Sequence, residues 1–121
     1  MLAIPKNLMY ICPMYSKELL KGTLRTIVLK LLSEHGRMYG YQITQEVKER
    51  TNGEIILTEG ALYPTLHKLE AEGLLSTEKE YIGKRVRKYY RLTQTGNATA
   101  IAKIQEFADF VKTMQRLLEL G

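Results

Sequence analysis

The spacing of apolar residues changes twice along this chain, and these changes limit what it can fold into. From residue 16 to residue 73 apolar side chains recur three or four apart, which is the period of an amphipathic helix. Residues 74 to 92 alternate instead, as in a half-buried strand, and helical spacing then returns. We therefore predict an α+β fold that is mostly α, with three helices, a ribbon of strands and one long last helix.

The first predicted helix runs from Ser16 to Gly36. Ser16 is a typical N-cap residue, and Gly36 is a typical helix stop. Six apolar residues between them fall on one side of the helix: Leu20, Leu24, Ile27, Val28, Leu31 and Leu32. A shorter second helix is predicted over residues 39–53, because Ile43 and Val47 lie four apart with polar residues between them.

A third helix is predicted in the stretch TEGALYPTLHKLEAEGLL, residues 58–75. The β-branched run EIILT, which leads into it, is predicted as a short strand. Thr58 is placed to cap the helix and Gly73 to end it. Three residues at helical spacing form its buried face: Leu62, Leu66 and Leu69. Pro64 falls on the opposite face near the helix start, where a missing N–H costs least.

The face opposite these leucines is low and smooth over the first helical turns. It presents small residues and a few polar ones: Gly60, Ala61, Pro64, His67 and Lys68, flanked by Tyr63 and Thr65. Small residues at a helix N-terminus let a DNA strand approach closely, and the helix dipole favours a phosphate there. The alternative is a tightly packed helix start with a solvated edge and no binding role.

Residues 74–92 are predicted as a two-stranded antiparallel ribbon with an exposed tip at 82–85. Between residues 79 and 91, six cations accompany one acidic residue, Glu80: Lys79, Lys84, Arg85, Arg87, Lys88 and Arg91. Three helices followed by a ribbon with a basic tip is the order of a winged helix-turn-helix, whose recognition helix enters the major groove of DNA. A basic cluster beside such a helix indicates phosphate contacts.

A long helix is predicted from Thr93 to the end of the chain. Apolar residues recur along it at alternating intervals of four and three: Ala100, Ile104, Phe107, Val111, Met114 and Leu118. Others widen the stripe: Ile101, Ala108, Phe110 and Leu117. Because the stripe is wider than one packing neighbour requires, we expect a homodimer, formed through Ile104, Phe107, Val111, Met114 and Leu118.

The composition indicates one domain with an appendage. The chain has 121 residues, 45% of them hydrophobic, and its net charge of +5 favours an anionic partner such as nucleic acid. Its only cysteine, Cys12, excludes an internal disulfide and suits a reducing compartment. No apolar run approaches the roughly 20 residues of a membrane span. We predict a cytoplasmic protein with an N-terminal arm (1–15), a DNA-binding domain (16–93) and a dimerisation helix (94–121).

Four segments, in this order and spacing, resemble the PadR family of bacterial transcriptional regulators. They are KGTL at 21–24, MYGYQI at 38–43, TEGALYPTLHKLEAEGLL at 58–75 and RKYYRLTQTG at 87–96. The resemblance implies a winged helix-turn-helix repressor that dimerises through its C-terminal helix. It also implies binding to a pseudo-palindromic operator in double-stranded DNA and release by a small-molecule effector.

The resemblance further implies which residues contact DNA. The start of the second helix supplies Tyr39, Gly40 and Tyr41. The recognition helix supplies Thr58, Glu59, Ala61, Tyr63, Pro64, Thr65 and Lys68. The exposed position of His67 adds this residue to the set. The wing supplies Lys84, Arg85, Arg87 and Lys88. Of the neighbouring pair Tyr89 and Tyr90, we expect one in the core.

Members of the family with a short, single C-terminal helix include some that bind planar aromatic compounds at the dimer centre. This chain has no tryptophan on which to stack such a ligand. Phe107 is therefore the first candidate for an effector site, and Phe110 is the second. The alternative is that both are ordinary residues of the dimer core.

Two other classes of function have less support in the sequence. A winged helix that binds only proteins, without sequence-specific DNA binding, predicts an acidic or neutral wing, whereas residues 84–88 are basic. An enzyme has little support, because the sequence has no paired carboxylates in a recognisable setting, no nucleophile elbow and no glycine-rich phosphate loop. His35 and His67 lie far apart with no cysteine near them, so we predict neither a metal site nor a cofactor.

Overall fold

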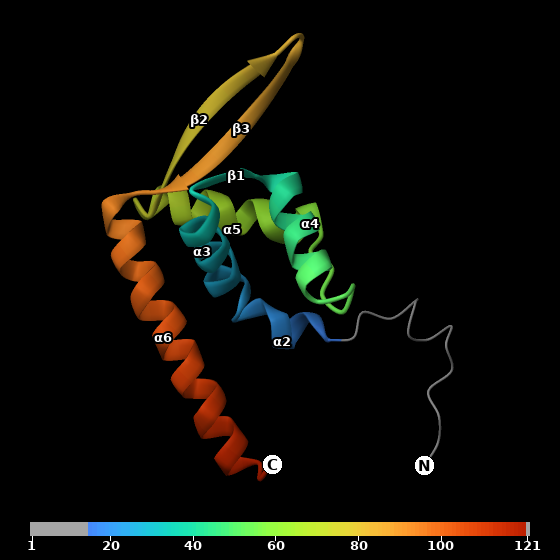
Figure 1. Ribbon diagram of the computed structural model, residues 1–121, viewed down its shortest axis with the longest axis vertical. Coiled ribbons are helices and arrows are strands. Elements are labelled where there is room, and N and C mark those ends of the chain that lie inside the picture. Colours follow the sequence, from blue (N-terminus) through green and yellow to red (C-terminus); the bar gives the residue numbers. More distant parts are fainter. Residues whose placement is uncertain (1–14, 121) are drawn as a thin grey trace, which may run out of the picture.

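The computed structural model describes residues 15–120, and its elements carry the labels of Figure 1. The helices are α2 (Lys17–Lys21), α3 (Leu24–His35), α4 (Gly40–Arg50), α5 (Glu59–Ala71) and α6 (Gln94–Leu117). The strands are β1 (Arg37–Tyr39), β2 (Leu75–Ile82) and β3 (Arg85–Leu92). Helices α3, α4 and α5 gather at the centre, the β2–β3 ribbon projects from them, and α6 runs the opposite way (Figure 1). The predicted winged helix-turn-helix with a long C-terminal helix is confirmed.

The first predicted helix is interrupted, so the prediction of one continuous helix was wrong. Helix α2 gives way to a turn at Gly22 and Thr23 before α3 begins. The Thr23 hydroxyl donates a hydrogen bond of 2.8 Å to the Leu20 carbonyl. The side chain therefore satisfies this carbonyl at the point where the helix is interrupted. Both predicted ends are correct, since the Ser16 hydroxyl caps α2 and Gly36 ends α3. The predicted arm, with Cys12, lies outside the described residues apart from its last position.

The sheet has three strands, in the order β1-β3-β2, and both pairings are antiparallel. The strand predicted at 54–58 was wrong, because these residues form a loop. Leu57 in this loop is buried, so its apolar character reflects core packing instead of strand pairing. The additional strand is β1, in which Met38 pairs with Tyr90 of β3, and both side chains are buried. We attribute the formation of β1 to this burial, because β-propensity depends strongly on packing.

The core lies between α3, α4, α5 and the inner face of the sheet. Its fully buried side chains include Leu29, Leu32, Ile43, Leu62, Leu66 and Leu69. The predicted cap of α5 is confirmed, because the Thr58 hydroxyl accepts the Ala61 N–H at 3.2 Å. Pro64 lies within α5 on its exposed side. Gly60, four residues earlier, is exposed too, so water can satisfy the carbonyl that Pro64 leaves without a partner.

Helix α6 has two different halves. Its start belongs to the core: the Thr93 hydroxyl caps it, Ala100 is 1% exposed, and Ile104 is half-buried. Gly96 is required there, because a Cβ would collide with the Leu74 carbonyl oxygen. Further along, large apolar side chains of α6 are exposed in the single chain: Phe107, Phe110, Val111 and Leu117. Across residues 15–120, no helix is both long and apolar enough to cross a membrane.

Candidate nucleic-acid interface

The N-terminal ends of α4 and α5 are joined by one tyrosine. Gly40, the first residue of α4, is buried, and a Cβ there would lie 2.6 Å from the Tyr63 hydroxyl oxygen. The burial of Gly40 argues against its predicted DNA contact and gives it a packing role, which is to let the Tyr63 ring cover the start of α4. The neighbouring Tyr41 is 60% exposed, and Tyr63 keeps 36% of its surface. These two tyrosines, unlike Gly40, are open to a ligand.

The exposed face of α5 carries most of the predicted recognition residues. Those open to solvent are Thr58, Glu59, Ala61, Pro64, His67 and Lys68. Thr65 is half-buried, and its hydroxyl donates a hydrogen bond of 3.2 Å to the Ala61 carbonyl. The ring centroids of Tyr63 and His67 lie 6.3 Å apart. This face combines small residues with hydrogen-bonding side chains, which is what reading base edges in a groove requires.

The register of the ribbon separates the basic residues of the wing onto two faces. Lys79 lies opposite Lys88, on the face that also carries the core tyrosine Tyr90. Arg87 lies opposite Glu80, on the outer face of the sheet. The predicted exposure of the tip at 82–85 is confirmed. A partner that lies along the wing therefore meets different cations on its two faces.

The two cations directly behind the tip of the wing, Arg87 and Lys88, already have partners, whereas those at the tip do not. The Lys88 Nζ lies 3.6 Å from Glu70 Oε1 of α5, and the Arg87 guanidinium lies 4.5 Å from the centre of the Tyr39 ring. Four of the predicted DNA-contacting cations form no ion pair within residues 15–120: Lys68, Lys84, Arg85 and Arg87. Of these four, only Arg87 lies over an aromatic ring of the described residues. The unpaired charge is thus concentrated on α5 and at the tip.

A cluster of charged residues on the outer face of the sheet was not predicted. The Arg37 guanidinium contacts two carboxylates, with Nη1 3.0 Å from Glu78 Oε1 and Nη2 2.8 Å from Glu80 Oε2. Arg91 also contacts Glu78, at 3.2 Å. Hydrogen bonds from Arg37 and then Arg91 hold the pKa of the Glu78 carboxyl below its usual range. The two acidic residues were visible in the sequence, but Arg37 joins them only because β1 pairs with β3.

The adjacent tyrosines of β3 lie on opposite faces of the sheet. Tyr90 is 1% exposed in the core, and burial raises the pKa of its hydroxyl. Tyr89 is buried on the outer face, where the Arg37 guanidinium lies 4.0 Å from the centre of its ring. The prediction that one of the two is a core residue is confirmed.

An apolar groove of about 1430 Å³ lies between α6 and the helices α2 and α3. Four of the five predicted dimerisation residues line it: Ile104, Phe107, Val111 and Met114. Leu118 follows the last residue of α6 and does not line the groove. The two predicted effector residues, Phe107 and Phe110, both line it, with ring centroids 6.5 Å apart. Leu19 and Ile27 are among the residues of the opposite wall.

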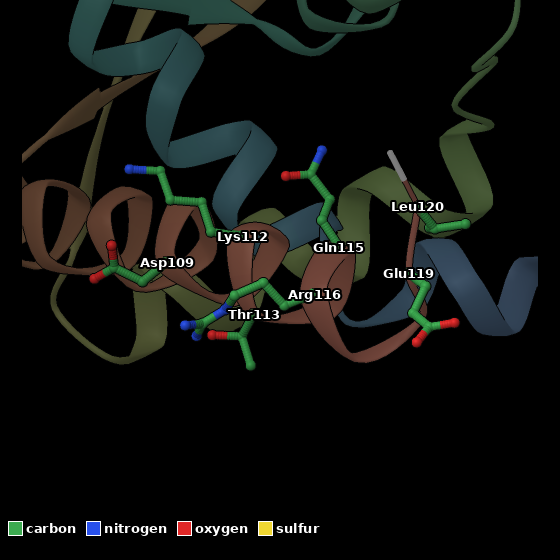
Figure 2. Close-up of a pocket in the computed structure, with 7 residues that line it drawn as sticks. All are labelled: Asp109, Lys112, Thr113, Gln115, Arg116, Glu119 and Leu120. Carbon is green, nitrogen blue, oxygen red and sulfur yellow. The ribbon is translucent and has the colours of Figure 1, made fainter.

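A second hollow lies along the last turns of α6. Figure 2 shows its lining, which is mostly polar or charged: Asp109, Lys112, Thr113, Gln115, Arg116, Glu119 and Leu120. All seven belong to α6 or to the residues directly after it, so a ligand would meet only one wall. We assign no site there. In the described part of the chain, no group of three or more His, Cys, Asp or Glu side chains is placed to hold a metal ion.

Comparison with known proteins finds one family. Residues 28–102 match the transcriptional regulator PadR-like family. The chain is 34% identical over 82 residues to transcriptional regulator Rv3488 of Mycobacterium tuberculosis, an alignment that covers 68% of this chain and 73% of that protein.

Solved structures of similar proteins agree with this match. A transcriptional regulator from Clostridium thermocellum superposes with a TM-score of 0.75 at 28% identity, over 84% of this chain and 96% of that one. A PadR family transcriptional regulator from Eggerthella lenta superposes with a TM-score of 0.73 at 31% identity, over 86% of this chain and 88% of that one.

Proposed function

The chain belongs to the PadR-like family of transcriptional regulators, and from this premise we propose that it is a dimeric repressor that binds a pseudo-palindromic DNA operator. The family consists of regulators, not enzymes. The observation that carries the proposal is the placement of unpaired charge, with Lys68 on α5 and Lys84 and Arg85 at the wing tip. Cations so placed neutralise phosphates on either side of a helix that reads bases.

Each part of the interface has a distinct proposed role. The first turns of α5 enter the major groove, where Tyr63, Thr65 and His67 reach base edges or phosphates. Tyr39 and Tyr41 contact the DNA backbone from the start of α4. Arg87 and Lys88 contribute less than the tip cations, because each already has a partner within the chain.

The dimer is proposed to form through the second half of α6. Phe107, Val111 and Leu117 are exposed in the single chain and follow one another along this helix. Contiguous apolar surface of this kind marks an interaction site, and a second copy of α6 provides a complementary apolar stripe. The two recognition helices would then lie roughly 34 to 36 Å apart, one turn of the duplex. In this proposal residues 16–93 form the DNA-binding domain and residues 94–121 form the dimerisation helix.

The effector is proposed to be a small aromatic or hydrophobic molecule. Phe107 and Phe110 are tilted by 44° to one another and line the apolar groove, so they offer two ring faces to a planar ligand. If Phe107 holds the effector, Phe107→Ala should abolish release from DNA. Because Phe107 also lies in the proposed dimer interface, release is measured at a protein concentration at which the variant is dimeric and bound to DNA. Retained release in this variant would refute the assignment and leave Phe107 as a dimer-core residue.

The experiment that tests DNA binding is fluorescence anisotropy against DNA from upstream of the protein's own gene and against a scrambled duplex, each over a range of salt. A regulator that reads sequence should bind the first duplex roughly a thousandfold more tightly than the second. Equal and steeply salt-dependent binding to both would contradict a specific operator in that DNA. If the protein binds neither duplex, the alternative function is favoured, which is a winged helix that binds only proteins.

A further inference from the structure

The wing is tied to the helical body by one arginine that crosses the sheet. Arg37 lies on the edge strand β1, and its side chain passes over the central strand β3, where its guanidinium lies 4.0 Å from the centre of the Tyr89 ring. It ends on the far strand β2, at Glu78 and Glu80. A single side chain thus contacts the other two strands of the sheet.

This cross-sheet contact continues to the start of α4. The Tyr89 ring meets the Tyr39 ring edge to face, with centroids 5.4 Å apart and an interplanar angle of 80°. Tyr39 is the N-cap of α4, and its N–H donates to the Gln42 side chain at 3.0 Å. The Arg87 guanidinium also lies 4.5 Å from the centre of the Tyr39 ring. The chain of contacts therefore joins the wing to the helix that presents Tyr41.

The backbone alone anchors the wing over a short length. Strand β1 pairs with β3 at only three positions and ends at the pair Tyr39 with Tyr89. Beyond this pair the ribbon continues for several residues to Ile82 and Arg85, held by pairing between its own two strands. A two-stranded ribbon is marginally stable by itself. On its inner face it also has the Lys88 contact with Glu70, and on its outer face it has Arg37.

We propose that Arg37 is a positioning residue that fixes the direction of the wing and so brings Lys84 and Arg85 to the DNA. The role of Arg37 in DNA binding rests on the proposed function, whereas its effect on the wing does not. Arg37 acts through Glu78, Glu80 and Tyr89 and makes no DNA contact itself, since both terminal nitrogens of its guanidinium are already bound to carboxylates.

The first test measures the wing without DNA. In Arg37→Gln, the backbone amide order parameters of residues 80–87 should fall from about 0.85 towards 0.6, the range of flexible backbone. Arg50→Gln is the matched control, because Arg50 also contacts two carboxylates, Glu34 and Glu46, but on helices α3 and α4. Unchanged order parameters in Arg37→Gln, or an equal fall in Arg50→Gln, would overturn the proposal.

The second test measures DNA affinity in a double-mutant cycle. Arg37→Gln should weaken operator binding about tenfold, as expected for the loss of two ion pairs and a cation–π contact. It should also lower the salt slope, by no more than the loss of the Lys84 and Arg85 contacts accounts for, and in a background with Lys84→Ala and Arg85→Ala it should change neither the affinity nor the slope. A further loss of affinity and a slope lower by about one in that background would make Arg37 a phosphate contact and overturn the proposal.

A third variant separates positioning from simple charge. Replacing Glu78 and Glu80 by Gln removes two negative charges from a DNA-binding surface, which electrostatics alone predicts to tighten binding. The proposal predicts the opposite, a loss similar to that of Arg37→Gln, because the same contact is broken from its other end. Tighter binding would overturn the proposal. If the wild-type chain binds no DNA, the proposed function fails, while the order parameters still decide whether Arg37 holds the wing.

Discussion

The two halves of α6 are built from similar apolar residues but have opposite surroundings. Ala100 in the first half is 1% exposed, whereas Leu117 in the second half is 70% exposed. The first half packs against α3 and the core, and the second half diverges from α2 and α3 along the apolar groove (Figure 1). The start of this apolar stripe completes the fold of the single chain, whereas its end is exposed and is the surface that we propose for the dimer.

The largest effect should come from the core of the single chain, which the first half of α6 completes. Leu66→Ala removes a fully buried side chain from α5 and should lower the free energy of unfolding by about 2 to 5 kcal/mol. Leu117→Ala, the matched change on the open side, should cost the single chain less than about 0.5 kcal/mol. Urea unfolding of both variants, under conditions in which the protein is monomeric, checks this. Equal losses would mean that Leu117, at the exposed end of α6, stabilises the single chain as much as a core leucine does.

A charge in the groove should have the next largest effect. Val111→Asp should raise the dimer dissociation constant by roughly a hundredfold or more, because an unpaired charge would be buried in the interface. Sedimentation measures it. Thr113→Asp is the control, since Thr113 lines the polar hollow of Figure 2 and not the groove. An intact dimer in Val111→Asp would place the interface elsewhere.

A smaller effect should distinguish Arg85 at the tip of the wing from Lys88 behind it. Arg85→Ala should reduce the slope of log affinity against log salt by about one, as loss of one phosphate contact predicts. Lys88→Ala should reduce it less, since Lys88 already contacts Glu70. Anisotropy at several salt concentrations compares the two. Equal reductions would show that pairing within the chain does not weaken a phosphate contact.

The smallest effect should be a loss of stability as the pH is lowered. The pKa of Glu78 is lowered in the folded state, so its contribution to stability is fully present above its unfolded pKa of about 4.3 and is lost as the pH falls through the folded value. Carboxyl NMR titration should find the pKa of Glu78 higher in Arg37→Gln than in the wild type. An unchanged pKa would mean that Arg37 does not hold this carboxylate in solution.

The sequence by itself determined the elements whose signals are local. The period of the leucines fixed the buried face of α5, Thr58 and Gly73 fixed its ends, and the alternation after residue 74 fixed the ribbon. These features were predictable because each depends on neighbours within a few residues. The same local reasoning was wrong at Gly22, where a turn interrupts an apolar pattern that continues across it.

Only the tertiary structure decided which distant residues meet. Arg37 contacts Glu78 across 41 positions of sequence, and the burial of Gly40 depends on Tyr63 from another helix. The edge strand β1 has only three residues, so it has too little sequence pattern to be predicted and forms because Met38 is buried against Tyr90. The physical reason is that the spacing of apolar residues specifies which face of a helix or strand is buried. Which element packs against that face depends on packing and charge between segments far apart in the chain.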